Sequence, residues 1–277
     1  MVDSGLHLMT DQELVMLIEH VRVQTGINLD ESKRYLLESR LSPILQNFSI
    51  GSYTELLERV AVDSSIENQA LINAITTNET YFFRDGHPFD LLKNKLIPDL
   101  LKRNQNKIIK IASAACSSGQ EAYSMAMVLK ETLFDLSDSM VEIRGFDISS
   151  KVVTAARRGE YSKFEVQRGL SEDRISRYFD CVNGRYQVKP ELRSIVTFGK
   201  QNLLKPLSIK AEYHIVFCRN VVNYFEDKDR ALLFQNLASM LVPCGVLVIG
   251  ATEFINDKPG NFIKKNEQGS VYYEKVG

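Results

Sequence analysis

The sequence predicts an α/β fold preceded by an all-α region, and three observations support this. From residue 10 to about residue 75, apolar side chains recur every three or four positions without a strand candidate. After about residue 106, short apolar stretches alternate with helical ones, which is typical of a largely parallel sheet covered on both faces. A strong hairpin turn, Asn183-Gly184, interrupts this alternation and indicates a small antiparallel β insertion.

The N-terminal helices are predicted from their apolar spacing and their capping residues. The first carries Leu14, Leu17, Ile18 and Val21; the second opens at Asp30-Glu31-Ser32 and carries Tyr35, Leu36, Leu41 and Leu45. Ser52 is expected to cap a third helix, and Asp63-Ser64-Ser65 to open a fourth. We therefore expect a helical N-terminal domain over residues 1–75, then a linker and motif segment over residues 76–106.

The remainder, residues 107–277, is expected to hold the α/β domain, with the β-subdomain at about 178–194. The expected strands span residues 108–112, 141–146, 195–198, 214–218, 246–251 and 271–274. The expected helices span residues 121–131, 151–158 and 229–241.

Composition excludes several classes of protein. The 277 residues are 44% hydrophobic and 25% charged, with a formal net charge of −1, so nucleic acid binding through bulk positive charge is not expected. No apolar run approaches the roughly 20 residues of a membrane span, and the start lacks a secretory signal, so we expect a cytoplasmic protein without membrane insertion. The four cysteines are scattered, so we expect reduced thiols and no metal site.

A cofactor site is predicted where the first two strands end, because ligands of open parallel sheets bind beyond the carboxyl ends of the strands. The first strand runs into the small-residue loop 113–119, followed by Glu121, an anionic group that favours a cationic ligand and disfavours a pyrophosphate. The dinucleotide fingerprint G-x-G-x-x-G is missing. Asp147 ends the second strand, where an acidic residue can bind ribose hydroxyls. A ribose joined to a cationic amino acid describes S-adenosylmethionine.

Two further segments place polar groups beside this site. Residues 76–84, Thr-Thr-Asn-Glu-Thr-Tyr-Phe-Phe-Arg, combine small hydrogen-bonding side chains with aromatic rings and Arg84, which suits a ligand-contacting surface. The strand ending at Cys218 is followed by Arg219, Asn220 and Tyr224. No Asn-Pro-Pro-Tyr tetrapeptide, typical of amino-methylating enzymes, occurs in the chain.

These segments resemble the chemotaxis receptor methyltransferases, the CheR family of protein-glutamate O-methyltransferases. The resemblance covers nearly the whole chain and rests on residues 76–84, 115–124, 146–149 and 217–225, with Asn202-Leu203-Leu204 also fitting. It departs from the family where Gly119-Gln120-Glu121-Ala122 replaces Gly-Glu-Glu-Pro, and where Gly-Phe-Asp ends the second strand in place of Thr-Asp. The resemblance implies a Rossmann-like class I methyltransferase domain behind the helical one, with the β-subdomain inserted in it.

The resemblance also implies the site residues and the chemistry. Glu121 is expected to hold the methionine amino group of S-adenosylmethionine and Asp147 its ribose, while the catalytic residues nearest the methyl group are Arg84 and Tyr224. The other expected cofactor-binding residues are Asn78, Thr80, Asn202, Leu203, Arg219 and Asn220, and Arg84 is expected to contact the cofactor as well. A glutamate carboxylate, with an ordinary pKa of about 4.3, is already ionised and needs no general base. The products are a glutamate methyl ester and S-adenosylhomocysteine.

The implied partner is the cytoplasmic helical domain of methyl-accepting chemotaxis receptors, recognised by a monomer. Lys33, Arg34 and Arg40 on the second helix are the candidates for contacting an acidic helix, although residues 1–75 contain 5 Lys and Arg against 11 Asp and Glu, a net of −6. Some family members bind a receptor tail by strand addition. The loop 181–185 here is short and lacks the Gly-x-Gly sequence linked to that binding, so we expect no dependence on a tail.

Three other functions stay open on the sequence. One is a methyltransferase acting on a different protein or on a small molecule. Another is a non-catalytic adaptor that keeps the methyltransferase fold and binds S-adenosylmethionine as a signal. A nicotinamide oxidoreductase is disfavoured by the missing glycine fingerprint and by the charge of Glu121.

Overall fold

The computed structural model describes residues 8–103, 108–133, 140–206, 211–255, 260–267 and 270–277. The chain forms two compact units: residues up to Thr77 together with Tyr224–Asp229, and Asn78–Asn223 together with Arg230–Gly277. We call them the helical unit and the sheet unit. Among the residues described, we find no helix with both the length and the apolar character of a membrane span.

The helical unit is a bundle, and its third and fourth α-helices begin at the predicted capping residues. Its elements are α1 (Asp11–Thr25), the 3-10 turn η1 (Glu31–Lys33), α2 (Arg34–Asn47), α3 (Tyr53–Val60) and α4 (Ile66–Ile75). Thr10 and Glu13 form a capping box on α1, and the side chains of Ser52 and Ser65 cap α3 and α4. Asp30 caps η1, which leads directly into α2.

The bundle core confirms the predicted periodicity, with one shift. Leu14, Leu17 and Val21 of α1 are buried against residues of the other three α-helices. On α2 the buried stripe begins at Leu37, whereas Tyr35 is exposed and Leu36 lies at the edge of exposure. Tyr35 and Leu36 thus lie on the predicted second helix, but neither belongs to its buried face, which is set by Leu37 and Leu41.

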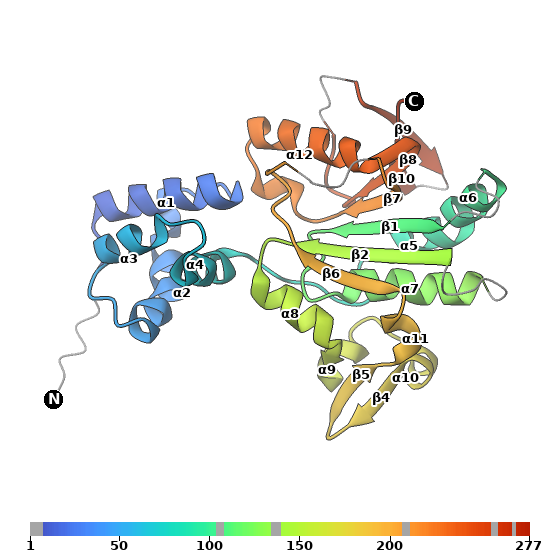
Figure 1. The fold of residues 1–277 in the computed structure, drawn as a ribbon, viewed down its shortest axis with the longest axis horizontal. Coiled ribbons are helices and arrows are strands. Elements are labelled where there is room, and N and C mark those ends of the chain that lie inside the picture. The colour runs from blue at the N-terminus through green and yellow to red at the C-terminus, as the bar shows by residue number, and fades with distance from the viewer. Residues whose placement is uncertain (1–7, 104–107, 134–139, 207–210, 256–259, 268–269) are drawn as a thin grey trace. The chain divides into compact units, whose positions relative to one another are not determined.

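The sheet unit is built on a seven-stranded sheet in the order β6-β2-β1-β7-β8-β10-β9 (Figure 1). The strands are β1 (Ile109–Ala114), β2 (Val141–Asp147), β6 (Val196–Lys200), β7 (Tyr213–Cys218), β8 (Leu241–Ile249), β9 (Phe262–Glu267) and β10 (Ser270–Lys275). The five strands β6, β2, β1, β7 and β8 are parallel, and β10 and β9 add an antiparallel end. The predicted α/β fold is confirmed; β9 was not predicted, because its residues are mostly exposed and polar.

The strand order reverses beside β1, and this decides where the helices lie. The chain passes from β1 through α7 (Gln120–Thr132) to β2 on one side, and from β7 through α12 (Asp227–Met240) to β8 on the other (Figure 1). The two connections lead toward opposite edges of the sheet. Because such crossovers are right-handed, their helices α7 and α12 lie on opposite faces of the sheet. Helix α8 (Ser150–Arg158) packs on β2 and β6 beside α7.

Three helical segments precede β1 in the region expected as a linker. They are α5 (His87–Leu91), the π-helical turn η2 (Leu92–Leu96) and α6 (Ile97–Arg103), and the first two of them pack against α7. Pro88 and Pro98 obscure this stretch in the sequence. Pro88 lies in the first turn of α5, where proline is tolerated, whereas Pro98 lies inside the continuous helical stretch, two residues after the π-helical turn η2.

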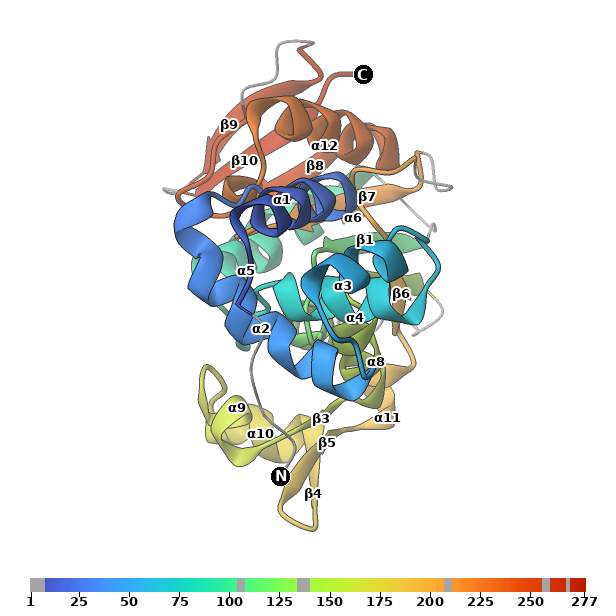
Figure 2. The same cartoon turned by 90° about the vertical axis from the view of Figure 1, so that its left-hand side faces the viewer.

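A small lobe interrupts the chain between α8 and β6, as the Asn183-Gly184 turn predicts. Its antiparallel sheet has the order β3-β5-β4, from β3 (Glu160–Tyr161), β4 (Phe179–Val182) and β5 (Arg185–Val188). Asn183 and Gly184 have φ values of 50° and 76°, the left-handed pair of a tight hairpin. Helices α9 (Lys163–Gln167), α10 (Glu172–Tyr178) and α11 (Pro190–Arg193) flank it (Figure 2).

The lobe is fixed to residues 78–84 by a close backbone approach at Gly169. Gly169 has a φ of 112°, and a Cβ atom there would lie 2.0 Å from the carbonyl oxygen of Phe82. The Phe82 ring is buried and packs edge-on against Tyr161 and Phe179 of the lobe. Only glycine allows this approach, so the sequence of the lobe determines how residues 78–84 are supported.

We predict that Gly169→Ala destabilises the protein more than Gly184→Ala. Both glycines are left-handed, so each alanine costs about 1–2 kcal/mol of backbone strain. A Cβ at Gly184 meets nothing within 4 Å, whereas one at Gly169 meets backbone, which adds about 1–3 kcal/mol. Chemical denaturation of both variants measures the difference in unfolding free energy; equal losses would contradict the close approach.

Candidate functional site

The predicted site residues gather at the carboxyl ends of the parallel strands, where the strand order reverses. In the register of the sheet, Ala114 of β1 pairs with Phe146 of β2 and with Cys218 of β7. Asp147 and Arg219 directly follow these two partners. The reversal of strand order at β1 is the position where open α/β sheets bind ligands.

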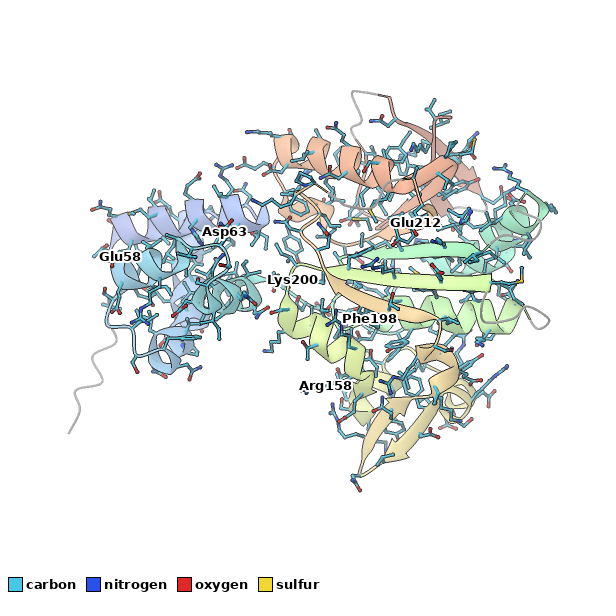
Figure 3. All side chains as sticks on the ribbon, viewed as in Figure 1. Glu58, Asp63, Arg158, Phe198, Lys200 and Glu212 are labelled. Atoms are coloured by element: carbon cyan, nitrogen blue, oxygen red, sulfur yellow. The ribbon has the colours of Figure 1, made fainter. Side chains whose placement is uncertain are left out.

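The loop after β1 takes an unusual backbone path. Ala115, Ser117 and Gly119 alternate in the left-handed region, with φ values of 62°, 49° and 96°. A Cβ at Gly119 would lie 2.9 Å from the Cβ of Ala156 and 3.0 Å from the Phe198 ring, so only glycine lets α7 begin so close to α8 and β6 (Figure 3). Such strain is typical of functional sites, because the surroundings must enforce it.

Asp147 holds this loop through its carboxylate. Its Oδ2 atom accepts a hydrogen bond from the Ser117 amide at 2.8 Å, and Oδ1 accepts one from the Ser149 amide at 3.0 Å. Burial raises the pKa of the Asp147 carboxyl above its ordinary value, although these amides and that of Ile148 act in the opposite direction. Asp147, the residue expected to bind the ribose, is thus hydrogen-bonded to the loop after β1.

A buried ion network joins three separate segments around Arg219. The Nη1 atom of Arg219 donates to Glu121 Oε2 at 2.8 Å, and Nη2 donates to Asp85 Oδ2 at 2.7 Å and to the Arg84 carbonyl oxygen at 2.8 Å. Ser113 donates to the other oxygen of Glu121 at 2.7 Å. The side chain of Arg219 is 1% exposed, that of Glu121 is 12% exposed and that of Asp85 is 31% exposed.

This network has the charge and the spare donor that the expected cofactor requires. Two carboxylates share one guanidinium, so the network has a formal charge of −1 and favours a cation. Within the described part of the chain, the Nε–H of Arg219 is buried and has no hydrogen-bond partner. An α-amino acid end fits here: its ammonium suits Glu121 and its carboxylate suits the vacant Nε–H donor. The residues present therefore fit S-adenosylmethionine.

The loop after β6 contains Asn202 and Leu203. The Gln201 amide donates to the Asp147 carbonyl oxygen at 2.9 Å, which keeps this loop beside the end of β2. Asn202 accepts a hydrogen bond from the Leu204 amide at 2.9 Å, a turn that asparagine commonly forms, and Leu203 is buried. An apolar side chain and an amide in this position suit an adenine base, as expected for these two residues.

Residues 78–84 adjoin the loop after β1. The Asn78 carbonyl oxygen accepts a hydrogen bond from Ser117 Oγ at 2.9 Å, and Thr80, two residues further on, is half-buried. The Arg84 guanidinium donates to the Glu79 carbonyl oxygen at 2.7 Å and lies 5.8 Å from the centre of the Tyr81 ring. Thus Asn78, Thr80 and Arg84 all lie in the sheet unit with Glu121, Asp147 and Arg219.

A second arginine lies beside the Tyr81 ring. The guanidinium of Arg168 is 4.4 Å from the ring centre, and its Nη2 atom is 2.8 Å from Glu79 Oε1. The side chains of Arg168 and Glu79 are 42% and 62% exposed. Together with Arg84, this exposed group has a formal charge of +1, opposite in sign to the buried network.

The structure does not bring every predicted residue to this site. Tyr224 belongs to the segment that clusters with the helical unit, where its carbonyl oxygen accepts a hydrogen bond from the Asn28 amide at 2.8 Å. Lys33, Arg34 and Arg40 also belong to that unit. The pairing of Tyr224 with Arg84 therefore stays a prediction.

The three recognition candidates have different surroundings within the helical unit. Lys33 is exposed and lies in η1, one residue before α2, not on the α-helix where it was expected. Arg34 pairs with Asp11 and donates to the Met9 carbonyl oxygen. Arg40 donates to the Ile75 carbonyl oxygen at 2.6 Å. Of these three residues, Lys33 is the one whose charge can be changed without breaking a side-chain hydrogen bond or ion pair among the residues that the structure describes.

Sequence reasoning missed four residues that shape the site. Asp85 directly follows Arg84, Ser113 lies near the end of β1 and Ser117 lies in the loop after it, so their polar side chains were available signals. Glu253 gave none: it follows β8 and accepts hydrogen bonds from the amides of Asn220, Val222 and Gly250. Two of these amides lie more than thirty residues away in the sequence and the third lies in the same turn as Glu253. Because all three are main-chain groups, no pattern of side chains could have predicted them.

Comparison with known proteins identifies relatives along almost the whole chain. Residues 12–76 match the all-alpha domain of CheR methyltransferases, and residues 78–271 match the SAM binding domain of CheR methyltransferases. The chain is 39% identical to chemotaxis protein methyltransferase 1 of Pseudomonas aeruginosa, over 90% of this chain and 93% of that protein. It is 38% identical to chemotaxis protein methyltransferase Cher2 of Pseudomonas putida, with the same coverage. It is also 38% identical to a chemotaxis protein methyltransferase of Vibrio parahaemolyticus, over 91% of this chain and 93% of that protein.

We predict that the affinity for S-adenosylhomocysteine falls as pH is lowered through the raised pKa of Asp147. Ribose hydroxyls would donate to the ionised carboxylate, and burial raises the pKa of this carboxyl above its ordinary value. The same shift makes this residue's contribution to folding stability decline as pH rises through that window, because the unfolded chain releases the proton first.

Calorimetric titration of wild type and Asp147→Asn over the same pH range tests this. Loss of hydrogen bonds to a charged acceptor costs about 1.5–3 kcal/mol, so we expect roughly 10- to 100-fold weaker binding by the variant. The variant should also lack the Asp147 component of the pH dependence, and other titrating groups cancel in the comparison. Parallel pH profiles would contradict a role for the ionised Asp147.

Proposed function

The chain belongs to the CheR family of methyltransferases, and on that premise we propose that it transfers methyl groups from S-adenosylmethionine to glutamate side-chain carboxylates of chemoreceptors. It is an S-adenosylmethionine-dependent methyltransferase. The observation that best supports the proposed substrate is the charge division within the sheet unit. The network centred on the buried Arg219 guanidinium has a formal charge of −1 and suits a cationic methyl donor. The group formed by Arg84, Arg168 and Glu79 has a formal charge of +1 and suits an anionic acceptor.

The proposed reaction depends on alignment of the glutamate carboxylate with the methyl group and does not require a general base. A glutamate carboxylate is the nucleophile in its ordinary ionised form at neutral pH. When bound, S-adenosylmethionine supplies an electrophilic methyl group. The residues of the chain bind and orient: Glu121 and Arg219 hold the amino acid end, Asp147 the ribose, and Asn202 and Leu203 the adenine. Alignment of reacting groups can lower a barrier by about 7–11 kcal/mol in favourable cases.

Arg84 is the proposed partner of the incoming carboxylate. It lies in the sheet unit with the cofactor residues, and its guanidinium has a single hydrogen bond to a main-chain oxygen among the residues described. A guanidinium with spare donors can bind a carboxylate in two places and fix its direction. Tyr224 is the proposed second contact to the reacting groups, through its hydroxyl.

Recognition of the receptor is proposed to use the helical unit. The substrate would be the cytoplasmic helical domain of a receptor, bound by a monomeric, cytoplasmic enzyme that does not depend on a receptor tail. Lys33 offers an exposed cation for an acidic helix, whereas Arg34 and Arg40 already have partners within the unit.

The function is tested by transfer of labelled methyl from S-adenosylmethionine to a receptor cytoplasmic fragment, followed by mild alkali. We expect label on the fragment that is released as methanol, since a carboxyl ester is hydrolysed under these conditions. Alkali-stable label would point to N- or S-methylation of a different substrate. Absence of label from several receptor fragments, with S-adenosylhomocysteine shown to bind, would favour an adaptor.

Arg84→Ala in the same assay separates binding from catalysis. We expect methyl transfer to fall by at least about 100-fold, because the carboxylate loses its alignment, while affinity for S-adenosylhomocysteine persists in part. Arg158→Ala is the control, since Arg158 is an exposed residue at the end of α8 (Figure 3). Wild-type turnover by Arg84→Ala would overturn its proposed role.

Lys33→Glu tests receptor recognition. We expect KM for the receptor fragment to rise by about 3-fold or more, with unchanged affinity for S-adenosylhomocysteine, because an exposed charge changes association and not the cofactor site. Lys33→Gln should give a smaller increase. An unchanged KM in Lys33→Glu would show that this cation does not contact the substrate.

A further inference from the structure

We propose that Glu253 is a positioning residue for cofactor binding: its buried carboxylate fixes the loop that carries Arg219 and Asn220. Glu253 is 7% exposed and follows β8, outside every segment that predicted the site. Its Oε2 atom accepts hydrogen bonds from the Asn220 amide at 2.9 Å and the Gly250 amide at 2.7 Å. Its Oε1 atom accepts one from the Val222 amide at 2.7 Å.

These three hydrogen bonds join the ends of two neighbouring strands. Cys218, the last residue of β7, pairs in register with Ile249, the last residue of β8. The loops that continue from them, at Asn220 and Gly250, are thus bound to one carboxylate group. Because a carboxylate accepts bonds from several amides at once, one side chain can define the relative path of both loops.

The loop after β7 needs such a restraint because its backbone is strained. Asn220 has a φ of 58°, in the left-handed region that non-glycine residues seldom occupy. Glu253 binds the amides of Asn220 and Val222, which lie at and just beyond the strained position. Strain of this kind persists where the surroundings over-determine it.

The path of this loop determines where Arg219 points. Arg219 directly precedes Asn220, and its guanidinium must reach Glu121 and Asp85 together, while its buried Nε–H has no partner among the residues that the structure describes. A small rotation of the loop would lengthen these bonds. Glu253 acts on the cofactor through Arg219 and Asn220, because both of its oxygens are already engaged by main-chain amides.

The surroundings of Gly250 also show that the Glu253 carboxylate packs tightly between the two loops. A Cβ on Gly250 would lie 2.6 Å from Oε2 of Glu253 and 3.1 Å from the Asn220 amide nitrogen. Any larger residue would therefore displace the carboxylate or the loop. Gly250→Ala moves the carboxylate without changing its charge, which gives a second variant with the same expected consequence.

The test is calorimetric titration of the full chain with S-adenosylhomocysteine, which requires no methyl acceptor. We expect Glu253→Gln to raise Kd by about 10-fold or more, because both glutamate oxygens accept N–H groups and the Gln NH₂ would face one of those donors. Gly250→Ala should raise Kd similarly. With both substrates varied, KM for S-adenosylmethionine should rise as well.

Glu13→Gln is the matched control. Glu13 is also buried and joins two elements through main-chain amides, those of Thr10 and Thr54 at 2.9 Å each, but it belongs to the helical unit. We expect Glu13→Gln to lower the thermal unfolding temperature and leave Kd unchanged. The proposal is overturned if Glu253→Gln and Gly250→Ala behave like this control, or if they lower kcat without changing Kd.

Discussion

The buried ion network around Arg219 is the interaction on which the rest of the site depends. A single guanidinium connects the end of β7, the first turn of α7 and the chain just after Arg84. Burying charges is costly unless each is paired and hydrogen-bonded, so the network is stable only when all three segments are in place. The strained backbone at Phe83 and Asp85, with φ values of 53° and 68°, lies directly at this junction. Cofactor binding and the position of Arg84 are therefore linked through one side chain.

Carboxylates bound to main-chain amides recur throughout the molecule. Asp147 holds the loop after β1, Glu253 holds the loop after β7, and Glu13 joins α1 to the start of α3. In each case an acidic side chain defines the path of a backbone segment distant in sequence. Nucleotide-binding folds often achieve such paths with glycine-rich turns, which let backbone approach a phosphate. Here the same edge of the sheet is shaped by anions, which suits a ligand that carries positive charge.

Much of the fold follows from local patterns. Capping residues such as Ser52 and Ser65, the apolar strands and the Asn183-Gly184 turn each depend on neighbouring residues, so they could be read from the sequence. The helices from His87 to Arg103 could not be predicted from the sequence, because Pro88 and Pro98 look like interruptions. At the site, Glu121 and Asp147 were predictable because they follow strands. Glu253 was not, because its partners are amides that every residue possesses.

The assignment of Tyr224–Asp229 to the helical unit means that the boundary between the two units is not one cut in the sequence. The chain crosses it after Thr77, again before Tyr224 and a third time after Asp229. Within the helical unit this segment pairs with residue 27 through Phe225. A fragment made by deleting the N-terminal helices would keep these six residues but lose the partners they bind. An exchange of the helical region between relatives should therefore carry this short internal segment together with the N-terminal helices.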